Sequence, residues 1–284
     1  MTYLILGATG LQGGAVAREL LKRGQPIRVL TRRAGSSKAK ALAKQGADVV
    51  EGDLSRPATL EPAFEGVAGV FSVQDFYAPG IGLVGELEQG RNVIAAAKAA
   101  GVRHIVQSSM GDGHTPGGPE HFVSKALLER DIKRSGLAWT LLGTVWFMDN
   151  LLNPEMKPHL LFPVLAGSLK ADTKFQMLAI KDLGWIVAEA LTDLDGWSGR
   201  KINLAGDVMT VPEMKRAYRE VTGKRPKSWR IPAAMFRKLV PEFAQQLGWH
   251  NRVNFAFGPE ELRAAKSDTV SFRVFLESHR IESM

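Results

Sequence analysis

Glycines at positions 7, 10 and 13 could bring the main chain close to a pair of phosphate groups. A backbone that turns sharply and lies against an anion has no room for side chains at the contact points. We expect Gly7 to form the turn, Gly10 to allow the close approach and Gly13 to let the next helix pack tightly on the preceding strand. The unpaired amides at the start of that helix would then face the anion. This chemistry is that of a dinucleotide pyrophosphate site.

The residues around these glycines predict the strand, turn and helix that such a site needs. An apolar run at 3–6 precedes them, and an amphipathic stretch with Val16 and Leu20 follows, with Gly24 suited to end the helix. The spacing GxxGxxG departs from the usual GxGxxG, so a tight turn that binds nothing is the alternative. The other contact candidates in this loop are Thr9, Leu11 and Gln12.

Basic residues follow the second expected strand, at 27–31, where a protein selective for NAD(H) offers an acidic residue to the adenosine ribose. This chain has Arg32 and Arg33 there, with Lys38 at the start of the next helix. Guanidinium groups attract a 2′-phosphate, whereas a carboxylate would repel it. We therefore predict NADP(H) as the cofactor, and two solvated surface arginines are the alternative.

Short apolar runs alternate with helical patterns along the first half of the chain, which predicts a parallel α/β sheet. Strands are expected at 3–6, 27–31, 47–51, 68–73, 104–108 and 138–142, and helices at 37–45, 58–64, 84–100 and 120–135. This alternation indicates a doubly wound Rossmann fold. We expect a Rossmann domain over 1–150 and a smaller C-terminal α/β subdomain for substrate or partner over 151–284, with about 175–205 returning to the Rossmann sheet.

The composition is that of a globular protein with a full core, at 284 residues and 45% hydrophobic content. No run approaches the roughly 18 apolar residues of a membrane span and no secretory leader is recognisable, so a cytoplasmic protein is expected. The chain has no cysteine, and its histidines show no metal-ligand spacing. The net charge of +8 arises largely from a basic segment at 215–238. A solvated surface is favoured there over binding of nucleic acid or an acidic partner, because no nucleic-acid-binding motif accompanies it.

Several motifs occur in a fixed order along residues 1–205. They are the glycine loop at 7–13, Gly52-Asp53-Leu54, the segment 92–102, Ser108-Ser109, the segment 121–125 and the segment 146–152. This ordered set resembles the NmrA-like family, whose members are atypical relatives of the short-chain dehydrogenases. The resemblance implies an NADP(H)-binding Rossmann domain with a smaller C-terminal subdomain.

The resemblance also implies roles for residues outside the glycine loop. Candidates for contacts with the adenine edge are Asp53 and Leu54. Candidates for the nicotinamide half are Ser72, Gln74, Lys125, Phe147 and Asn150. Among these, Lys125 would donate to the ribose hydroxyls, and Phe147 with Asn150 would close over the ring. A turn or helix cap is the alternative for both Asp53 and Asn150.

Proton transfer is the step at which this chain departs from the dehydrogenating relatives. They use a Tyr-x-x-x-Lys pair, whose spacing places both side chains on one face of a helix. Here the residue four before Lys125 is His121, and none of the three tyrosines lies at that helix. His121 could act as a general acid beside Lys125, because imidazole titrates near neutrality. A histidine with no catalytic part is the alternative.

Two functions from different classes follow. In the first, which the missing tyrosine favours, the protein binds NADP(H) without turnover and reports the NADPH/NADP ratio to a regulatory protein partner. In the second, it is an NADPH-dependent reductase of a quinone-like or other aromatic acceptor, because hydride transfer to a good acceptor needs little acid catalysis. An apolar wall of Trp146, Phe147 and Met148 would suit such a ligand, and a packed hinge is the alternative. The sequence leaves homodimer formation open.

Overall fold

A computed structural model describes residues 1–111, 118–152, 158–226, 237–238 and 240–279. Its contacts divide the chain into two compact units. The first consists of Met1–Met110, Val123–Gly143 and Leu183–Ile202, and the second of Gly111–Phe122, Thr144–Asp182 and Asn203–Met284. Each unit is therefore assembled from segments that are far apart in the sequence.

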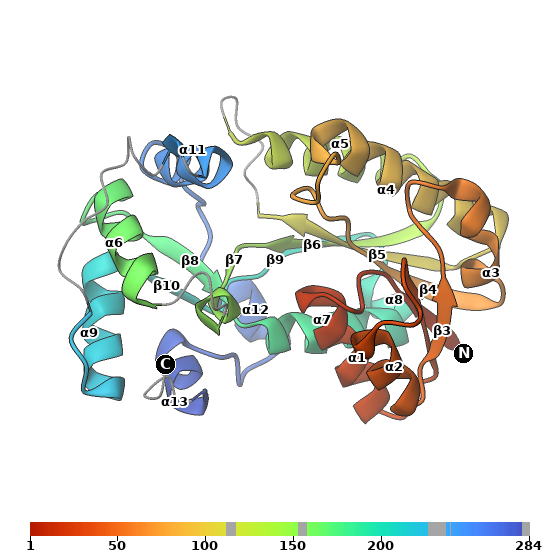
Figure 1. Cartoon of the computed structure of the whole chain (residues 1–284), viewed down its shortest axis with the longest axis horizontal. Coiled ribbons are helices and arrows are strands. Elements are labelled where there is room, and N and C mark those ends of the chain that lie inside the picture. Colours follow the sequence, from red (N-terminus) through yellow and green to blue (C-terminus); the bar gives the residue numbers. More distant parts are fainter. Residues whose placement is uncertain (112–117, 153–157, 227–236, 239, 280–284) are drawn as a thin grey trace. The chain divides into compact units, whose positions relative to one another are not determined.

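The first unit is built on a seven-stranded sheet with the order β3-β2-β1-β4-β5-β6-β9 (Figure 1). The strands are β1 (Thr2–Ile5), β2 (Ile27–Thr31), β3 (Asp48–Glu51), β4 (Val67–Ser72), β5 (His104–Met110), β6 (Ala138–Thr144) and β9 (Arg200–Asn203). Strands β1 to β5 pair in parallel, with Ile5 opposite Val29 in β2 and Phe71 in β4. The strand order reverses between β1 and β4, which is where doubly wound sheets bind their ligands.

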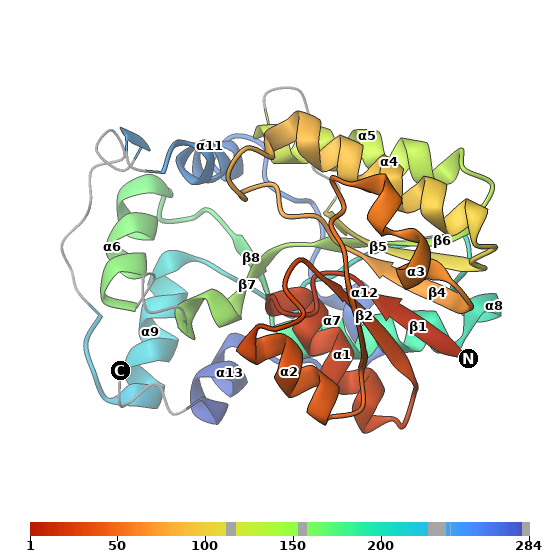
Figure 2. The same ribbon diagram turned by 45° about the vertical axis from the view of Figure 1, so that its right-hand side comes forward.

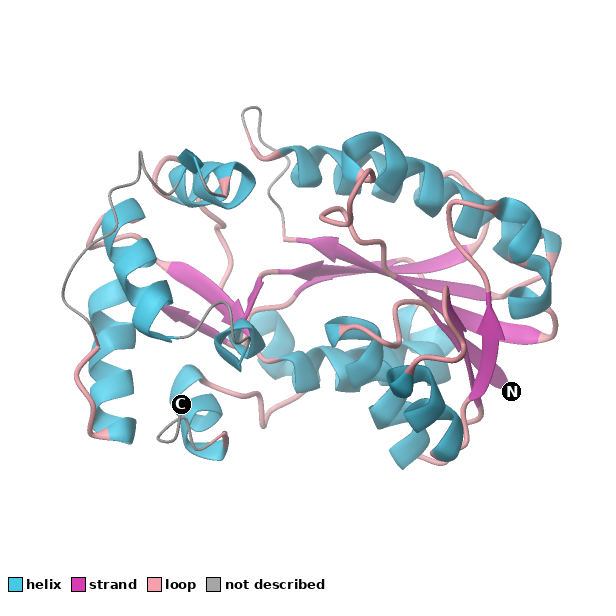
Figure 3. Cartoon of the chain, in the orientation of Figure 1, coloured by secondary structure: helices cyan, strands magenta, loops and turns pink. Residues whose placement is uncertain are grey.

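Helices cover both faces of this sheet. They are α1 (Leu11–Lys22), α2 (Ser37–Lys44), α3 (Glu61–Phe64), α4 (Gly82–Ala99), α5 (Glu120–Lys133), α7 (Ile180–Thr192) and α8 (Leu194–Trp197), with a 3-10 turn at Pro57–Thr59. Figures 1 and 2 show α4 and α5 on one face and α1 and α7 on the other. Figure 3 shows the same layers by element type. The predicted doubly wound Rossmann architecture is confirmed.

The core of the first unit explains why the predicted strands and helices form where they do. Leu4, Val70 and Ile105 project from neighbouring strands into one apolar cluster, which Phe64 of α3 and Leu128 of α5 complete. Alternate strand residues share a face, so a short apolar run supplies side chains to both helical layers. This packing aligns the carboxyl ends of the strands at one edge of the sheet.

Local signals set the ends of the first two helices. Gly24 follows α1 with a φ of +67°, a left-handed conformation that glycine adopts readily. The Ser36 side chain accepts a hydrogen bond from the Ala39 amide and caps α2. Because β1 and β2 are parallel, the loops that lead from them into α1 and α2 lie at the same edge of the sheet.

The second unit contains a three-stranded sheet with the order β10-β8-β7. Its elements are β7 (Trp146–Phe147), a 3-10 helix (Met148–Leu152), α6 (Pro158–Ser168), β8 (Phe175–Leu178), β10 (Asp207–Met209), α9 (Val211–Thr222), α11 (Pro241–His250), α12 (Glu260–Ala265) and α13 (Phe272–Ser278). Strand β8 runs antiparallel to β10 and parallel to β7. Buried Phe162, Phe175 and Phe272 belong to its apolar core. Sequence patterns predicted few of these elements, because the strands are short and the helices mix charged with apolar residues.

The basic segment at 215–238 begins on α9, where Arg216 and Arg219 are exposed. Its members Lys227 and Arg230 lie outside the described residues. Among the helices that the structure describes, none combines the length and the apolar composition needed to cross a bilayer.

Candidate functional site

The glycine loop joins β1 to α1 in the first unit. Gly7 has a φ of +64°, and the Gly10 amide donates to the Gly7 carbonyl oxygen at 2.9 Å, which closes a tight turn. A Cβ at Gly13 would lie 2.4 Å from the Leu6 carbonyl oxygen and 2.4 Å from the Gly7 carbonyl carbon. No side chain fits at that distance from main-chain atoms, so glycine at position 13 sets how closely α1 approaches β1.

The start of α1 is suited to an anion. Gly10 is the N-cap residue, no side chain in the described part of the chain caps the helix, and its first turn carries no acidic residue. The free amides and the positive end of the helix dipole therefore remain for a ligand. Thr9 is half-buried and Leu11 is exposed in this loop. The Gln12 side chain accepts a hydrogen bond from the Ser108 hydroxyl at 2.6 Å, which connects the loop to the end of β5.

The loop between β2 and α2 carries the three basic candidates. Arg32, Arg33 and Lys38 are all exposed. The Arg33 amide donates to Thr31 Oγ1 at 3.3 Å, and the Ala34 amide donates to Glu51 Oε2 at 2.9 Å. The loop backbone is therefore supported from β2 and β3, which leaves the cationic side chains in solvent, where they can reach an anion.

The segment after β3 is held by side chains of α4. Asp53 Oδ1 accepts a hydrogen bond from the Ser55 amide at 2.9 Å, so the carboxylate stabilises a turn. A turn is the alternative role that the sequence offers for Asp53. Asn92 donates to the Leu54 carbonyl oxygen at 2.8 Å, and Gln89 donates to Ser55 Oγ at 2.9 Å. Sequence reasoning missed the positioning roles of Gln89 and Asn92, although a polar residue on the inner face of an amphipathic helix is a usable signal.

Ser72 is the last residue of β4 and Gln74 lies two positions further on, and both are buried. Gln74 Nε2 donates to Ser72 Oγ at 2.9 Å, and Gln107 of β5 donates to Gln74 Oε1 at 3.1 Å. The two predicted residues are thus bonded directly to each other, and Gln107, which the sequence did not single out, extends the network to β5. Buried amides need such partners, because an unpaired one costs about 1–3 kcal/mol.

Lys125 lies on α5 and pairs with Glu86 of α4. The Lys125 ammonium is 2.7 Å from Glu86 Oε1, and the Ser124 hydroxyl donates to Glu86 Oε2. The Glu86 side chain is completely buried, whereas 17% of the Lys125 side chain is exposed. Sequence reasoning missed Glu86, although an acidic residue beside the apolar positions of α4 was visible.

His121 belongs to the second unit, where it pairs with Glu242 of α11. The Nδ1 atom of His121 is 2.8 Å from Glu242 Oε1, and the His121 amide lies 3.3 Å from the same oxygen. Hydrogen bonding from His121 lowers the pKa of the Glu242 carboxyl below its ordinary value, against the opposing effect of burial. The residue at the tyrosine position therefore carries a carboxylate partner from a helix 121 positions further along the chain.

The segment 146–152 belongs to the second unit. Trp146 and Met148 are buried in its core, where the Trp146 ring lies 5.7 Å from that of Phe175. The expectation that they form an apolar wall with Phe147 is wrong, because their side chains fill the interior, and the packed alternative describes them. Phe147 and Asn150 are half-buried. The neighbouring Asp149 accepts from the Ile180 amide at 2.8 Å.

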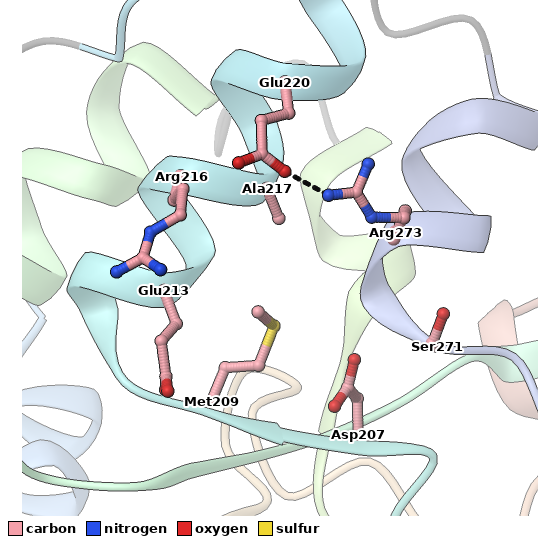
Figure 4. A pocket seen from close by; sticks show the side chains of 8 residues that line it. All are labelled: Asp207, Met209, Glu213, Arg216, Ala217, Glu220, Ser271 and Arg273. Carbon is pink, nitrogen blue, oxygen red and sulfur yellow. Dashed lines mark hydrogen bonds and ion pairs between the residues drawn. The ribbon is translucent and has the colours of Figure 1, made fainter.

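The second unit also has an open cavity of about 480 Å³ between β10, α9 and α13 (Figure 4). Its carboxylates already serve internal contacts: Asp207 accepts from the Phe272 amide, and Glu220 pairs with Arg273. In the described ranges, no group of three or more His, Cys, Asp or Glu residues is arranged to hold a metal ion. The glycine loop, the basic loop after β2 and the network of Ser72 and Gln74 belong to the first unit, whereas the candidates His121, Phe147 and Asn150 belong to the second.

Comparisons with known proteins agree with this architecture. The model of the NmrA-like family matches residues 1–263, so the chain belongs to the NmrA-like family. An NAD(P)H azoreductase of Xenophilus azovorans is 36% identical over 195 residues, which are 66% of this chain and 63% of that protein. Quinone oxidoreductase 2 of Escherichia coli is 31% identical over 228 residues, which are 78% of this chain and 74% of that protein.

Solved structures share the fold. The NADPH complex of the Escherichia coli quinone oxidoreductase has a TM-score of 0.80 at 24% identity and covers 99% of both chains. The negative transcriptional regulator NmrA, solved in complex with NADP, has a TM-score of 0.76 at 19% identity and covers 97% of this chain and 94% of its own. The proteins similar to this chain thus include two named as reductases, and the fold is shared by one named as a regulator.

Proposed function

We propose that the first unit binds NADP(H). The observation that carries this proposal is the glycine loop, where main-chain atoms of Leu6 and Gly7 occupy the space that a Cβ at Gly13 would need and the first amides of α1 are open to an anion. In this proposal Gly7, Gly10 and Gly13 form the pyrophosphate cradle. Arg32 and Arg33 lie on the loop that would face the adenosine ribose, so they favour a 2′-phosphate.

We further propose that the protein is an NADPH-dependent reductase of quinone-like or other aromatic acceptors. Two relatives named as an azoreductase and a quinone oxidoreductase support this choice. Bound NADPH would supply the hydride, and the acceptor would take up one proton with it. Such acceptors are electrophilic, so the reaction places a small demand on an acid, which fits a chain with His121 in place of the tyrosine. Lys125 of the first unit would donate hydrogen bonds to the ribose hydroxyls of the bound nucleotide.

A redox sensor is the second candidate, and the missing tyrosine favours it. The likeness to the regulator NmrA supports the same idea at the level of the fold. A sensor must bind its protein partner with an affinity that depends on nucleotide state. Equal partner affinity with NADPH, with NADP and without nucleotide would exclude this candidate.

The deciding experiment combines binding with turnover. Purified protein is titrated with NADPH by fluorescence, and a panel of quinones and azo compounds is then added while the NADPH absorbance is followed. Acceptor-dependent oxidation above the background rate supports the reductase, whereas tight binding without oxidation supports the sensor. Replacing Arg32 and Arg33 together by alanine should lower the preference for NADPH over NADH about ten- to a hundredfold, since one charge-assisted contact contributes roughly 1.5–3 kcal/mol. An unchanged preference would refute the assignment of these arginines.

A further inference from the structure

Two buried carboxylates of the first unit each join a hydroxyl and an ammonium group. Glu86 of α4 contacts Ser124 and Lys125 of α5. Glu129 of α5 contacts Ser109 of β5 and Lys201 of β9, with a distance of 3.0 Å to the ammonium. Burying a carboxylate is costly unless it is paired, so both clusters satisfy that requirement. Only the first cluster includes a residue of the proposed cofactor site.

The Glu86 cluster restricts where the Lys125 ammonium can lie. Both Glu86 oxygens are used, because Oε1 faces Lys125 at 2.7 Å and Oε2 accepts from the Ser124 hydroxyl. The carboxylate is therefore held at two points, and the ammonium that pairs with it has a defined position. A lysine ammonium has three donors, and the pair with Glu86 occupies one of them. With 17% of its side chain exposed, Lys125 can present the others to a ligand.

A lysine side chain without such a partner would sample many rotamers, and fixing it on binding would cost conformational entropy. A carboxylate that has already fixed the ammonium removes much of that cost before the ligand arrives. It also balances the positive charge of the partly buried ammonium. The geometry of Glu86 thus prepares Lys125 for hydrogen bonds to neutral hydroxyl groups.

We propose that Glu86 is a positioning residue, which sets the Lys125 ammonium for contact with the nicotinamide ribose of NADP(H). This inference rests on the proposed function. Under this proposal the two halves of the cofactor depend on different residues. The adenosine half would contact the glycine and arginine loops, and binding of the nicotinamide ribose hydroxyls would depend on Glu86 through Lys125.

The test compares two ligands on variants of the full chain. NADPH carries the nicotinamide ribose, whereas adenosine 2′,5′-bisphosphate lacks it but retains the 2′-phosphate. Glu86→Gln should weaken NADPH binding about tenfold, the equivalent of one weakened charge-assisted contact, and leave the bisphosphate affinity within about twofold. In a Lys125→Met background, Glu86→Gln should cause no further loss, because Glu86 acts through Lys125.

Glu129→Gln is the matched control. It neutralises a second buried carboxylate that also pairs with a serine and a lysine, so it should change thermal stability without changing either affinity. Glu86→Asp retains the charge and shortens the side chain by one methylene. If the Glu86→Gln protein does not fold, the Glu86→Asp protein takes its place in the test. It should weaken binding of NADPH and leave binding of the bisphosphate unchanged.

The outcomes separate this inference from the proposal beneath it. If wild-type protein binds neither ligand, the proposed cofactor site is wrong, and the role of Glu86 falls with it. If wild-type protein binds both and the Glu86 variants bind NADPH unchanged, or lose both ligands equally, the positioning role alone is overturned.

Discussion

Gly13→Ala is the sharpest test of the glycine loop. The new Cβ would lie 2.4 Å from the Leu6 carbonyl oxygen and 2.5 Å from the Gly7 carbonyl oxygen, about 1 Å inside ordinary contact. Both neighbours are main-chain atoms of the turn between β1 and α1, so they cannot rotate away as a side chain would. Forcing extra volume into a packed site costs about 1–3 kcal/mol. For a domain of this size that corresponds to a melting temperature lower by roughly 2–4 °C per kcal/mol.

The same displacement should weaken cofactor binding. Moving α1 away from β1 shifts the amides that would face the pyrophosphate, and loss of one charge-assisted hydrogen bond of about 1.5–3 kcal/mol weakens binding at least about tenfold. Calorimetric titration with NADPH measures the affinity, and thermal unfolding measures the stability.

Gly248→Ala serves as the control for a glycine replacement. Among the described residues, its Cβ would meet the flexible end of Arg252 at 3.3 Å, and alanine is favoured over glycine inside a helix by about 0.5–1 kcal/mol. It should leave NADPH affinity unchanged and not lower the melting temperature. A Gly13→Ala protein that melts and binds NADPH like the wild type would refute the steric reasoning.

Three further predictions concern packing and pH. Gly184→Ala should lower the melting temperature by several degrees, because its Cβ would lie 2.8 Å from a main-chain oxygen of α1; unchanged thermal unfolding would contradict this. Burial lowers the pKa of His104 and His250 to about 4, below the value near 6.5 expected in the unfolded chain. The unfolded state then binds more protons than the folded state between pH 6.5 and 4. The free energy of unfolding should therefore fall by up to about 3 kcal/mol per histidine as the pH drops through that range. Urea titrations at pH 7 and pH 5 would measure part of this fall. Glu242→Gln should destabilise the protein near neutral pH, and its difference from the wild type should shrink as the pH falls through the lowered pKa of Glu242; a difference independent of pH would count against the pairing.

Local sequence patterns predicted the elements of the first unit because each depends on neighbours in the chain. The strand expected at 27–31 is β2 (Ile27–Thr31), and the helix expected at 84–100 is α4 (Gly82–Ala99). The glycine spacing predicted a strand, a turn and a helix. The structure has this arrangement, with a positive φ at Gly7 in the turn and α1 beginning at Leu11. Periodicity and glycine conformation act over a few residues, so one sequence suffices to recognise them.

The partners of polar side chains depended on contacts across the fold. Lys125 was visible as a candidate, but its pairing with Glu86 required α4 and α5 to pack side by side. The Gln12 side chain similarly reaches Ser108, 96 positions away. Many lysine and arginine side chains along a chain could pair with a given carboxylate. Only the packing of the helices decides which of them lies within hydrogen-bond distance.

The sequence by itself determined the alternation of strands and helices, the glycine loop and the family, because these follow from residue type and short-range spacing. The tertiary structure decided that Trp146 and Met148 belong to a core and that His121 pairs with Glu242. Apolar residues look alike whether they line a pocket or fill an interior, and an ion pair between distant segments leaves no local pattern. Burial and long-range contact arise only when the chain has folded, and they set the chemistry that each side chain can perform.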